Sequence, residues 1–235
     1  MLDFLGIGAQ KCGTTWLHVN LKRHPAVFLP EPKELHFWNR PDGRDLAWYR
    51  DVFAGTAPGV LGGEITPAYG FLPIATIEAV RREFPDLRLI YCLRNPIERA
   101  WSSALMALGR AEMTLDEASD QWFIDHFHSA GSRARGDYEA CLRNWRAVFE
   151  PARIQVVLFD RIVACPLRVL REVAGGLGID AAFFDTVAPE LLAQPQNSGQ
   201  GHPLRPSLRP VLERLWRPRV SRLADYLGVD LDHWR

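Results

Sequence analysis

The fold of this chain is decided by residues 3–15, DFLGIGAQKCGTT. The run begins with a short apolar stretch that ends in glycine, which is typical of a buried parallel strand. Gly8 and Gly13 bound a loop, and a helix is expected from Thr14 to about Arg23. A strand, a glycine-containing loop and a helix in this order form an anion site, because N–H groups at the helix start point toward the ligand. The sequence therefore predicts a P-loop-like, phosphate-binding loop after the first strand.

Four more apolar runs predict strands, and segments with helical periodicity lie between them. The expected strands are 26–29, 60–64, 87–93 and 154–159. The expected helices are 74–84, 96–108, 114–127, 137–149, 167–177 and 211–227, the last with a break or kink at Pro218. Residues 39–59 are expected to form a surface excursion, and residues 194–210 a loop. This alternation predicts a single α/β domain over residues 1–235, with a central, mainly parallel sheet flanked by helices.

Composition and charge argue against several classes of protein. The chain has 28 Lys plus Arg and 28 Asp plus Glu residues, so its formal charge of zero gives no electrostatic case for nucleic acid or an anionic membrane. No apolar run reaches the roughly 18 residues of a membrane span, and the N-terminus lacks the basic region of a signal peptide. The four cysteines have no zinc-binding spacing, which favours a reduced, cytoplasmic protein without a metal site. His126 and His128 are expected on a solvated helix face.

The phosphate loop differs from the loop that binds nucleoside triphosphates. That loop has the pattern G-x-x-x-x-G-K-[ST], with the lysine directly after the second glycine. Gly8, Gly13 and Thr15 occupy the matching positions here, but Thr14 stands in place of the lysine, which has moved back to Lys11. The loop is therefore expected to hold a phosphate while placing its cation differently.

Residues 10–17, QKCGTTWL, resemble the 5′-phosphosulfate loop of the sulfotransferases that use 3′-phosphoadenosine 5′-phosphosulfate (PAPS). The likeness is closest to the bacterial and heparan-sulfate branch, whose loop has a K-x-G-T core. The resemblance implies a 5′-phosphate cradle made by Cys12, Gly13, Thr14, Thr15 and Trp16. It also implies that Lys11 contacts the leaving-group oxygen. A fixed cation there stabilises the transition state more than the ground state, because negative charge develops on that oxygen.

A second motif follows the strand expected at 87–93. Arg94 comes at the carboxyl end of that strand, and Ser102 lies about two turns into the next helix. An arginine and a hydroxyl that converge on one site hold a phosphate well. Residues 94–102, RNPIERAWS, resemble the family's 3′-phosphate motif R-[DN]-P-x-x-R-x-x-S. The resemblance implies that Arg94 and Ser102 bind the 3′-phosphate of the nucleotide, and Arg99 is expected to form a structural ion pair.

The second phosphate motif separates this interpretation from a kinase or GTPase. Such an enzyme needs a Mg²⁺-binding carboxylate at a strand end and has no need of a second phosphate site on the ribose. The strand ends offer Arg94 and Asp160, and Asp160 leads into Arg161, which makes it a poor Mg²⁺ ligand. Two other classes stay open, a P-loop-type nucleotide kinase or triphosphatase and a non-catalytic nucleotide-binding protein on the same fold.

A third segment, PEPKELHFW at residues 30–38, carries the candidate base. An acceptor hydroxyl or amine must lose a proton as it attacks, so a well-placed carboxylate or imidazole would help. If the chain is extended, Glu34 and His36 point to the same side. The segment resembles the family's K-E-x-H-F-[FW], in which the glutamate is the general base in the glycan branch and the histidine in others. We expect Glu34 to be the base, with His36 supporting or replacing it.

Two further segments resemble parts of the family's site. GEITPAY, residues 63–69, resembles an E-x-T-P-x-Y segment beside the acceptor, with Ile65 where the glycan enzymes often have lysine, which argues against a highly sulfated glycan acceptor. Near the C-terminus, Trp234 resembles the tryptophan that often packs there in the family.

NSGQGHP, residues 197–203, lies where the family has a loop that covers the cofactor. Ser198 and Gly201 are therefore expected to contact the nucleotide. The usual lysine of this loop is missing, and Arg205 and Arg209 are candidates to replace it.

Together, these resemblances imply transfer of a sulfuryl group from PAPS to a hydroxyl or amine of a small-molecule or carbohydrate acceptor. The second product is adenosine 3′,5′-bisphosphate. No metal, nucleic acid or membrane partner is implied.

Overall fold

A parallel β-sheet forms the centre of the protein. The computed structural model describes residues 1–196 and 201–234, and within them five strands pair in the order β2-β3-β1-β4-β5, all parallel. The strands are β1 (Leu2–Gly8), β2 (Val27–Phe28), β3 (Leu61–Ile65), β4 (Arg88–Leu93) and β5 (Ile154–Leu158). The expected single α/β domain with a central parallel sheet is confirmed.

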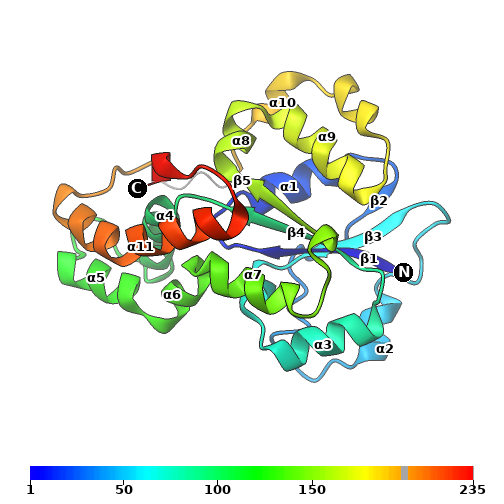
Figure 1. Ribbon diagram of the computed structural model, residues 1–235, viewed down its shortest axis with the longest axis horizontal. Helices are drawn as coiled ribbons and strands as arrows, with labels where there is room; N and C mark the ends of the chain where they lie inside the picture. The colour runs from blue at the N-terminus through cyan, green and yellow to red at the C-terminus, as the bar shows by residue number, and fades with distance from the viewer. Residues whose placement is uncertain (197–200, 235) are drawn as a thin grey trace.

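Helices cover both faces of this sheet (Figure 1). In chain order they are α1 (Thr14–Leu21), α2 (Leu46–Asp51), α3 (Ile74–Glu83), α4 (Pro96–Arg110), α5 (Asp120–His128), α6 (Ala130–Gly136), α7 (Tyr138–Arg146), α8 (Phe159–Ala164), α9 (Pro166–Leu177), α10 (Pro189–Ala193) and α11 (Arg209–Leu227). α8, α9 and α10 lie on one side of the sheet, and α3 lies on the other. α4, α5 and α11 lie beyond the carboxyl ends of the strands.

The hydrophobic core has two parts. The larger part surrounds β1, whose side chains are almost all buried, as expected for the middle strand of a sheet covered on both faces. A smaller cluster joins α4, α5 and α11 through Trp101, Phe123 and Trp216. Because this second cluster lies past the strand ends, it fixes α4 beside the place where ligands bind in such sheets.

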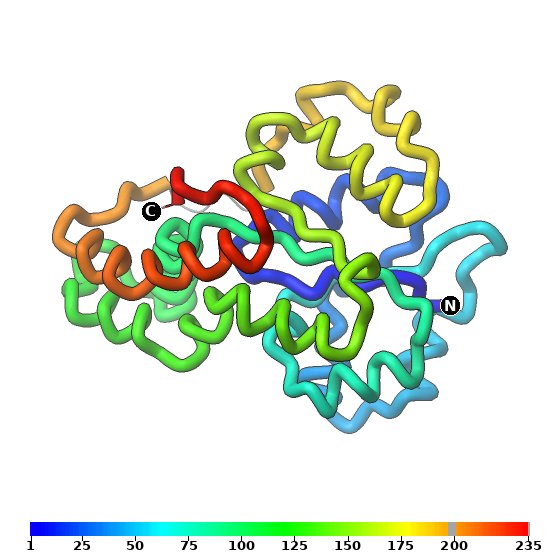
Figure 2. Tube along the Cα trace, in the orientation of Figure 1, coloured from blue at the N-terminus to red at the C-terminus, as the bar shows by residue number. Residues whose placement is uncertain are grey.

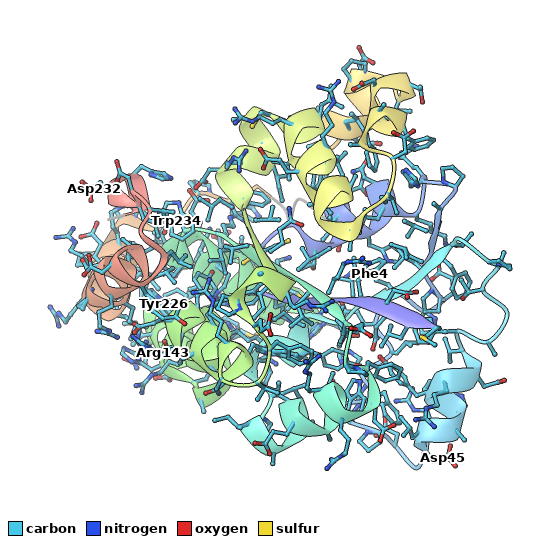
Figure 3. The ribbon with its side chains drawn as sticks, turned by 45° about the vertical axis from the view of Figure 1, so that its right-hand side comes forward. Phe4, Asp45, Arg143, Tyr226, Asp232 and Trp234 are labelled. Atoms are coloured by element: carbon cyan, nitrogen blue, oxygen red, sulfur yellow. The ribbon has the colours of Figure 1, made fainter. Side chains whose placement is uncertain are left out.

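Strands β1 and β3 fit together by matching glycines to large side chains. A Cβ at Gly63 in β3 would lie 2.2 Å from Cζ of Phe4, which is fully buried in β1 (Figure 3). The reciprocal case is Gly6 in β1, where a Cβ would lie 2.8 Å from the side chain of Ile65. Each strand thus leaves room for a side chain of the other, which fixes the register of the pair.

Two expectations about helices are corrected. The segment 39–59, expected to be an irregular excursion, contains α2, because the side chain of Asp45 caps it and accepts a hydrogen bond from the Trp48 N–H at 2.8 Å. α11 runs continuously through Pro218, so the break, one of the two expected alternatives, does not occur.

The helix expected at 114–127 begins later, at Asp120. Glu117 accepts hydrogen bonds from the N–H of Thr114 at 2.7 Å and from its hydroxyl at 2.8 Å, which closes a turn before the helix. Ser119 then caps α5. Side-chain bonds of this kind compete locally with helix formation.

The two ends of the chain lie on opposite sides of the molecule (Figure 2). Met1 is at the amino edge of the sheet, whereas a 3-10 turn, η5 (Asp232–Trp234), returns to the carboxyl edge. Within the described residues, no helix combines the length and the apolar character needed to cross a membrane.

Replacing Gly63 by Ala is expected to lower the free energy of unfolding by about 3 kcal/mol, because the new methyl group and the Phe4 ring need the same space. Urea unfolding measures the change. Gly175→Ala in α9 is the matched control, since a Cβ there meets nothing within 4 Å. It is expected to raise stability by about 0.5–1 kcal/mol. Equal effects of the two substitutions would contradict the packing of Phe4 on β3.

Candidate active site

A cavity of about 940 Å³ opens where β1 and β4 end. Its walls come from the start of α1, from α4 and α8, and from the C-terminal part of the chain. One face of α4 contributes side chains four residues apart, namely Glu98, Ser102, Met106 and Arg110. The predicted site residues that line the cavity are Lys11, Gly13, Thr14, Thr15, Trp16, Glu34, Arg94, Ser102 and Gly201.

Gly13 lets the loop turn into α1. Its φ of 90° lies in the left-handed region, and a Cβ would lie 3.0 Å from both Ile162 and Phe159 of α8. A larger residue would therefore be strained by its backbone and by its contacts. Because α1 starts directly after Gly13, the positive end of the helix dipole faces the cavity.

Lys11 belongs to a group of cations on the cavity wall. Burial lowers the pKa of Lys11, and the positive charges of Arg94 and Arg110 lower it further. All three side chains line the same cavity. Positive charges that crowd one another in this way are stabilised by an anion, so the cavity has the electrostatics of an anion site.

The side chains of Cys12 and Trp16 are both buried, and only Trp16 lines the cavity. Sγ of Cys12 lies 3.5 Å from the hydroxyl oxygen of Tyr138, and burial raises the pKa of this thiol, which makes it a poor nucleophile. The indole N–H of Trp16 donates to the Leu192 carbonyl at 2.6 Å, which ties the start of α1 to α10. Cys12 does not line the cavity, so its side chain is not part of the binding surface.

Arg94 and Ser102 reach the cavity from the end of β4 and from α4. The Arg94 guanidinium is paired with Glu98 at 3.0 Å and lies 4.5 Å from the centre of the Phe159 ring. These contacts hold the guanidinium at the cavity wall. A guanidinium has five N–H donors, so the pair with Glu98 leaves donors for a phosphate.

Among the described residues, Arg99 has no partner for the expected ion pair. It is fully buried, and its Nε and Nη1 have no hydrogen-bond partner in residues 1–196 and 201–234. Its Nη2 donates to the Ser132 carbonyl at 2.9 Å, and its guanidinium lies 5.8 Å from the centre of the Trp216 ring. Arg99 therefore joins α4 to α6 and α11 through a carbonyl and an aromatic ring.

Glu34 faces the cavity, and His36 lies beside Glu34 without lining the cavity. Glu34 Oε2 is 3.4 Å from His36 Nε2, and its Oε1 accepts a hydrogen bond from Lys33 at 2.9 Å. His36 Nδ1 lies 3.1 Å from Oδ1 of Asn39. The two side chains meet as expected, but through a turn rather than an extended strand, since His36 has a φ of 58°.

The buried carboxyl of Glu64 anchors this segment, a contact that the motif did not reveal. Leu35, between Glu34 and His36, donates its N–H to Glu64 Oε2 at 3.3 Å. Three hydroxyls also bond to the carboxyl, from Tyr49 at 2.5 Å, Tyr69 at 2.9 Å and Thr66 at 2.9 Å. Burial raises the pKa of Glu64, although these donors oppose the rise. Glu64 thus holds the candidate base in place through the backbone.

The segment expected to cover the cofactor is only partly described. Ser198 lies outside the described residues, and Gly201 lines the cavity with a φ of 68°. Arg209 also lines the cavity. Arg205 does not, because it pairs with Asp120 at 2.7 Å. Arg209 is therefore the better placed of the two candidate cations.

The C-terminal turn forms one wall of the cavity. Asp160 Oδ2 accepts a hydrogen bond from the Trp234 indole at 2.5 Å and lies 3.0 Å from Nε2 of His233, which lines the cavity. Figure 3 places Trp234 beside Asp232 at this end of the molecule. Asp160, the strand-end carboxylate considered above as a Mg²⁺ ligand, is thus bonded to the C-terminal turn.

The histidine pair of α5 is only partly exposed. His126 is half-buried and stacks on Trp122 at 5.9 Å between ring centroids, whereas His128 is exposed. The expected solvated face therefore holds for His128, whereas His126 is only partly exposed. In the part of the chain that the structure describes, no three His, Cys, Asp or Glu side chains are grouped to hold a metal ion.

Known proteins share this sequence and fold. A family model described as "Sulfotransferase family" matches residues 71–184. Heparan sulfate glucosamine 3-O-sulfotransferase 6 of Mus musculus is 31% identical over 185 residues, covering 76% of this chain and 53% of that protein. The solved sulfotransferase from Alicyclobacillus acidocaldarius is 27% identical with a TM-score of 0.79, covering 100% of this chain and 99% of that one. Mouse sulfotransferase SULT7A1, complexed with PAP, has the same fold with a TM-score of 0.61 at 15% identity, covering 97% of this chain and 88% of that one.

The chain belongs to the sulfotransferase family. It spans about half the length of the curated 3-O-sulfotransferases that it matches. The family model covers the segment with Arg94 and Ser102 but begins after the phosphate loop, whereas the structural match to the bacterial protein includes the whole chain.

Replacing Glu64 by Gln is expected to lower the free energy of unfolding by about 1–3 kcal/mol, because an NH₂ group replaces one of the two oxygens that together accept four hydrogen bonds. The loss should be largest at acid pH. Because the pKa of Glu64 is raised in the folded state, protonation of Glu64 stabilises the folded wild type. This stabilisation is complete below the ordinary pKa of 4.5 and is lost as pH rises through the folded-state pKa. Gln does not titrate, so the difference between the two proteins should shrink with rising pH.

Urea unfolding of both proteins between pH 4.5 and 8 measures this difference. Glu78→Gln on the exposed side of α3 is the matched control, and its effect on stability should be small. A Glu64→Gln loss that grows as pH rises would contradict the raised pKa.

Proposed function

We propose that residues 1–235 form one sulfotransferase domain that transfers a sulfuryl group from PAPS to a hydroxyl of a carbohydrate acceptor. The bond between sulfur and the bridging phosphate oxygen of PAPS breaks as sulfur bonds to the acceptor oxygen, which leaves adenosine 3′,5′-bisphosphate. The observation that carries the proposal is that two groups of residues suited to bind phosphate line one cavity. The first is the loop that ends at Gly13, and the second is Arg94 with Ser102.

The residues on the cavity wall fit a nucleotide with two phosphates. A helix N-terminus suits the 5′-phosphate, and a guanidinium with a hydroxyl suits the 3′-phosphate. Lys11 supplies a positive charge on the same wall. Its role in the proposal is to stabilise the negative charge that develops on the leaving oxygen.

Glu34 takes the acceptor proton in this proposal. It faces the cavity, and Lys33 and His36 flank its carboxylate at 2.9 and 3.4 Å. These two neighbours fix the orientation of the carboxylate, as a general base requires. His36 then acts as a support, because it does not line the cavity.

A carbohydrate acceptor is supported by the names of the curated relatives, which are heparan sulfate sulfotransferases. Arg110 adds a charge preference, since it is exposed and lines the same cavity as Glu34 and Lys11. An acceptor with at least one acidic group would pair with it. Ile65, where the glycan enzymes often have lysine, favours fewer acidic groups than a heavily sulfated chain carries.

Calorimetry with adenosine 3′,5′-bisphosphate and with ATP tests the nucleotide. The bisphosphate is expected to bind more tightly, and Arg94→Ala should weaken it by about 10- to 100-fold, because a charge-assisted contact to the 3′-phosphate is lost. Arg88→Ala is the matched control, since Arg88 begins the same strand at its opposite end and should leave the affinity unchanged. Failure of the bisphosphate to bind, or an Arg94→Ala protein of unchanged affinity, would overturn the proposal. Mg²⁺-dependent ATP turnover unaffected by Lys11→Ala would favour a kinase or triphosphatase.

Transfer of labelled sulfate from PAPS to a panel of oligosaccharides and simple alcohols tests the base. Glu34→Gln is expected to lower kcat by about 100-fold or more while leaving bisphosphate affinity unchanged, because it removes the proton acceptor. His36→Gln should cost less than Glu34→Gln.

Glu31→Gln is the control for this segment, because Glu31 is exposed and pairs with Lys22 outside the cavity. A larger loss from His36→Gln would transfer the role of base to His36. Tight bisphosphate binding with no transfer to any acceptor would instead point to a non-catalytic binding protein.

A further inference from the structure

The Tyr138 side chain lies between the two phosphate sites. Its hydroxyl donates a hydrogen bond to the Arg94 carbonyl at 2.8 Å, and the same oxygen lies 3.5 Å from Sγ of Cys12. The Cys12 thiol also lies 3.6 Å from the Gln10 carbonyl oxygen, to which it donates, so the contact between the hydroxyl and the thiol is a close polar contact between two groups that each donate to a carbonyl. A continuous line of side-chain contacts therefore joins the first phosphate loop to the end of β4.

Tyr138 is also firmly held. It is the first residue of α7 and is 2% exposed. Along the same helix, the guanidinium of Arg143 lies 4.5 Å from the centre of the Tyr226 ring in α11 (Figure 3), and Glu139 pairs with Arg222 of α11 at 3.2 Å. Contacts with α11 thus hold α7 in place, so the hydroxyl is presented to both loops from a rigid support.

We propose that Tyr138 is a positioning residue that fixes the distance between the 5′-phosphate and 3′-phosphate sites. The inference rests on the proposed function, because it assumes a nucleotide that spans both sites. The covalent structure of such a nucleotide sets the separation of its two phosphates. A protein that holds the two sites at a fixed spacing therefore gains affinity for the bisphosphate and gains nothing for a nucleotide with the 5′-phosphate alone.

A purely structural role for the hydroxyl makes a different prediction. If Tyr138 only satisfied the Arg94 carbonyl, its loss would lower stability and would affect both classes of nucleotide alike. The ratio of the two affinities is therefore the quantity that separates the two roles.

The experiment uses Tyr138→Phe, which keeps the ring and removes the hydroxyl. Calorimetry measures the affinities of the wild type and the variant for adenosine 3′,5′-bisphosphate and for adenosine 5′-monophosphate. The preference for the bisphosphate is expected to fall about fivefold in the variant, while the monophosphate affinity changes less than about twofold. An unchanged preference would overturn the inference, whether or not stability falls.

Tyr91→Phe is the matched control. The Tyr91 ring packs edge-on against that of Tyr138 at 6.2 Å, and its hydroxyl is hydrogen-bonded to Cys141. It should leave the preference unchanged. If both tyrosine variants lower the preference equally, the effect belongs to general packing and the inference fails.

Cys12→Ala provides a second test that does not depend on how well Tyr138→Phe folds. It removes the loop side of the contact and leaves the bond from Tyr138 to Arg94 in place. The preference for the bisphosphate should fall in the same direction, and an unchanged value would contradict the proposed link.

The wild-type titration separates the two proposals: if the wild type does not bind the bisphosphate, the proposed function fails and the inference fails with it. If the wild type binds it and the ratio is unchanged in the variants, only the inference fails.

Discussion

The parallel pairing of β1 with β4 puts Gly8 beside Tyr91, and across the ends of these strands the Ala9 N–H donates to the Cys92 carbonyl at 2.7 Å. Both strands end within a residue or two of this bond. The loop that turns at Gly13 and the side chain of Arg94 therefore start from neighbouring points. Every other cavity wall is arranged around that pair of strand ends, with α4 held there by its own hydrophobic cluster.

The electrostatics of the cavity come from local placement, since the chain as a whole has a formal charge of zero. Lys11, Arg94 and Arg110 meet at the cavity, and the crowding is visible in the lowered pKa of Lys11. The candidate base is treated differently. Glu34 lies between two basic side chains, and the backbone beside it is bonded to a carboxyl, Glu64, that is itself sealed from solvent. The three cations attract negative charge to the cavity, whereas the contacts around Glu34 hold its carboxylate in one position.

Sequence reasoning located the features that are local in the chain. The strand, loop and helix at residues 3–23 and the motif at 94–102 could be predicted because each is a short string whose place at a strand end follows from the parallel sheet. Contacts between distant segments could not. Cys12 and Tyr138 are 126 positions apart. Tyr49, which bonds to Glu64, belongs to α2. This helix has six residues, too few to show a helical periodicity in the sequence. The contacts of Arg99 could not be predicted either, because its neighbours come from α6 and α11, which are distant in the sequence.

The bond from Trp234 to Asp160 makes the two ends of the chain unequal as attachment points. The indole is buried, and the adjoining His233 is part of the cavity wall. An affinity tag or a surface-immobilisation linker joined at the C-terminal end would emerge next to the opening through which nucleotide and acceptor must pass. The same tag placed ahead of β1 would sit at the amino edge of the sheet, on the far side of the molecule (Figure 2).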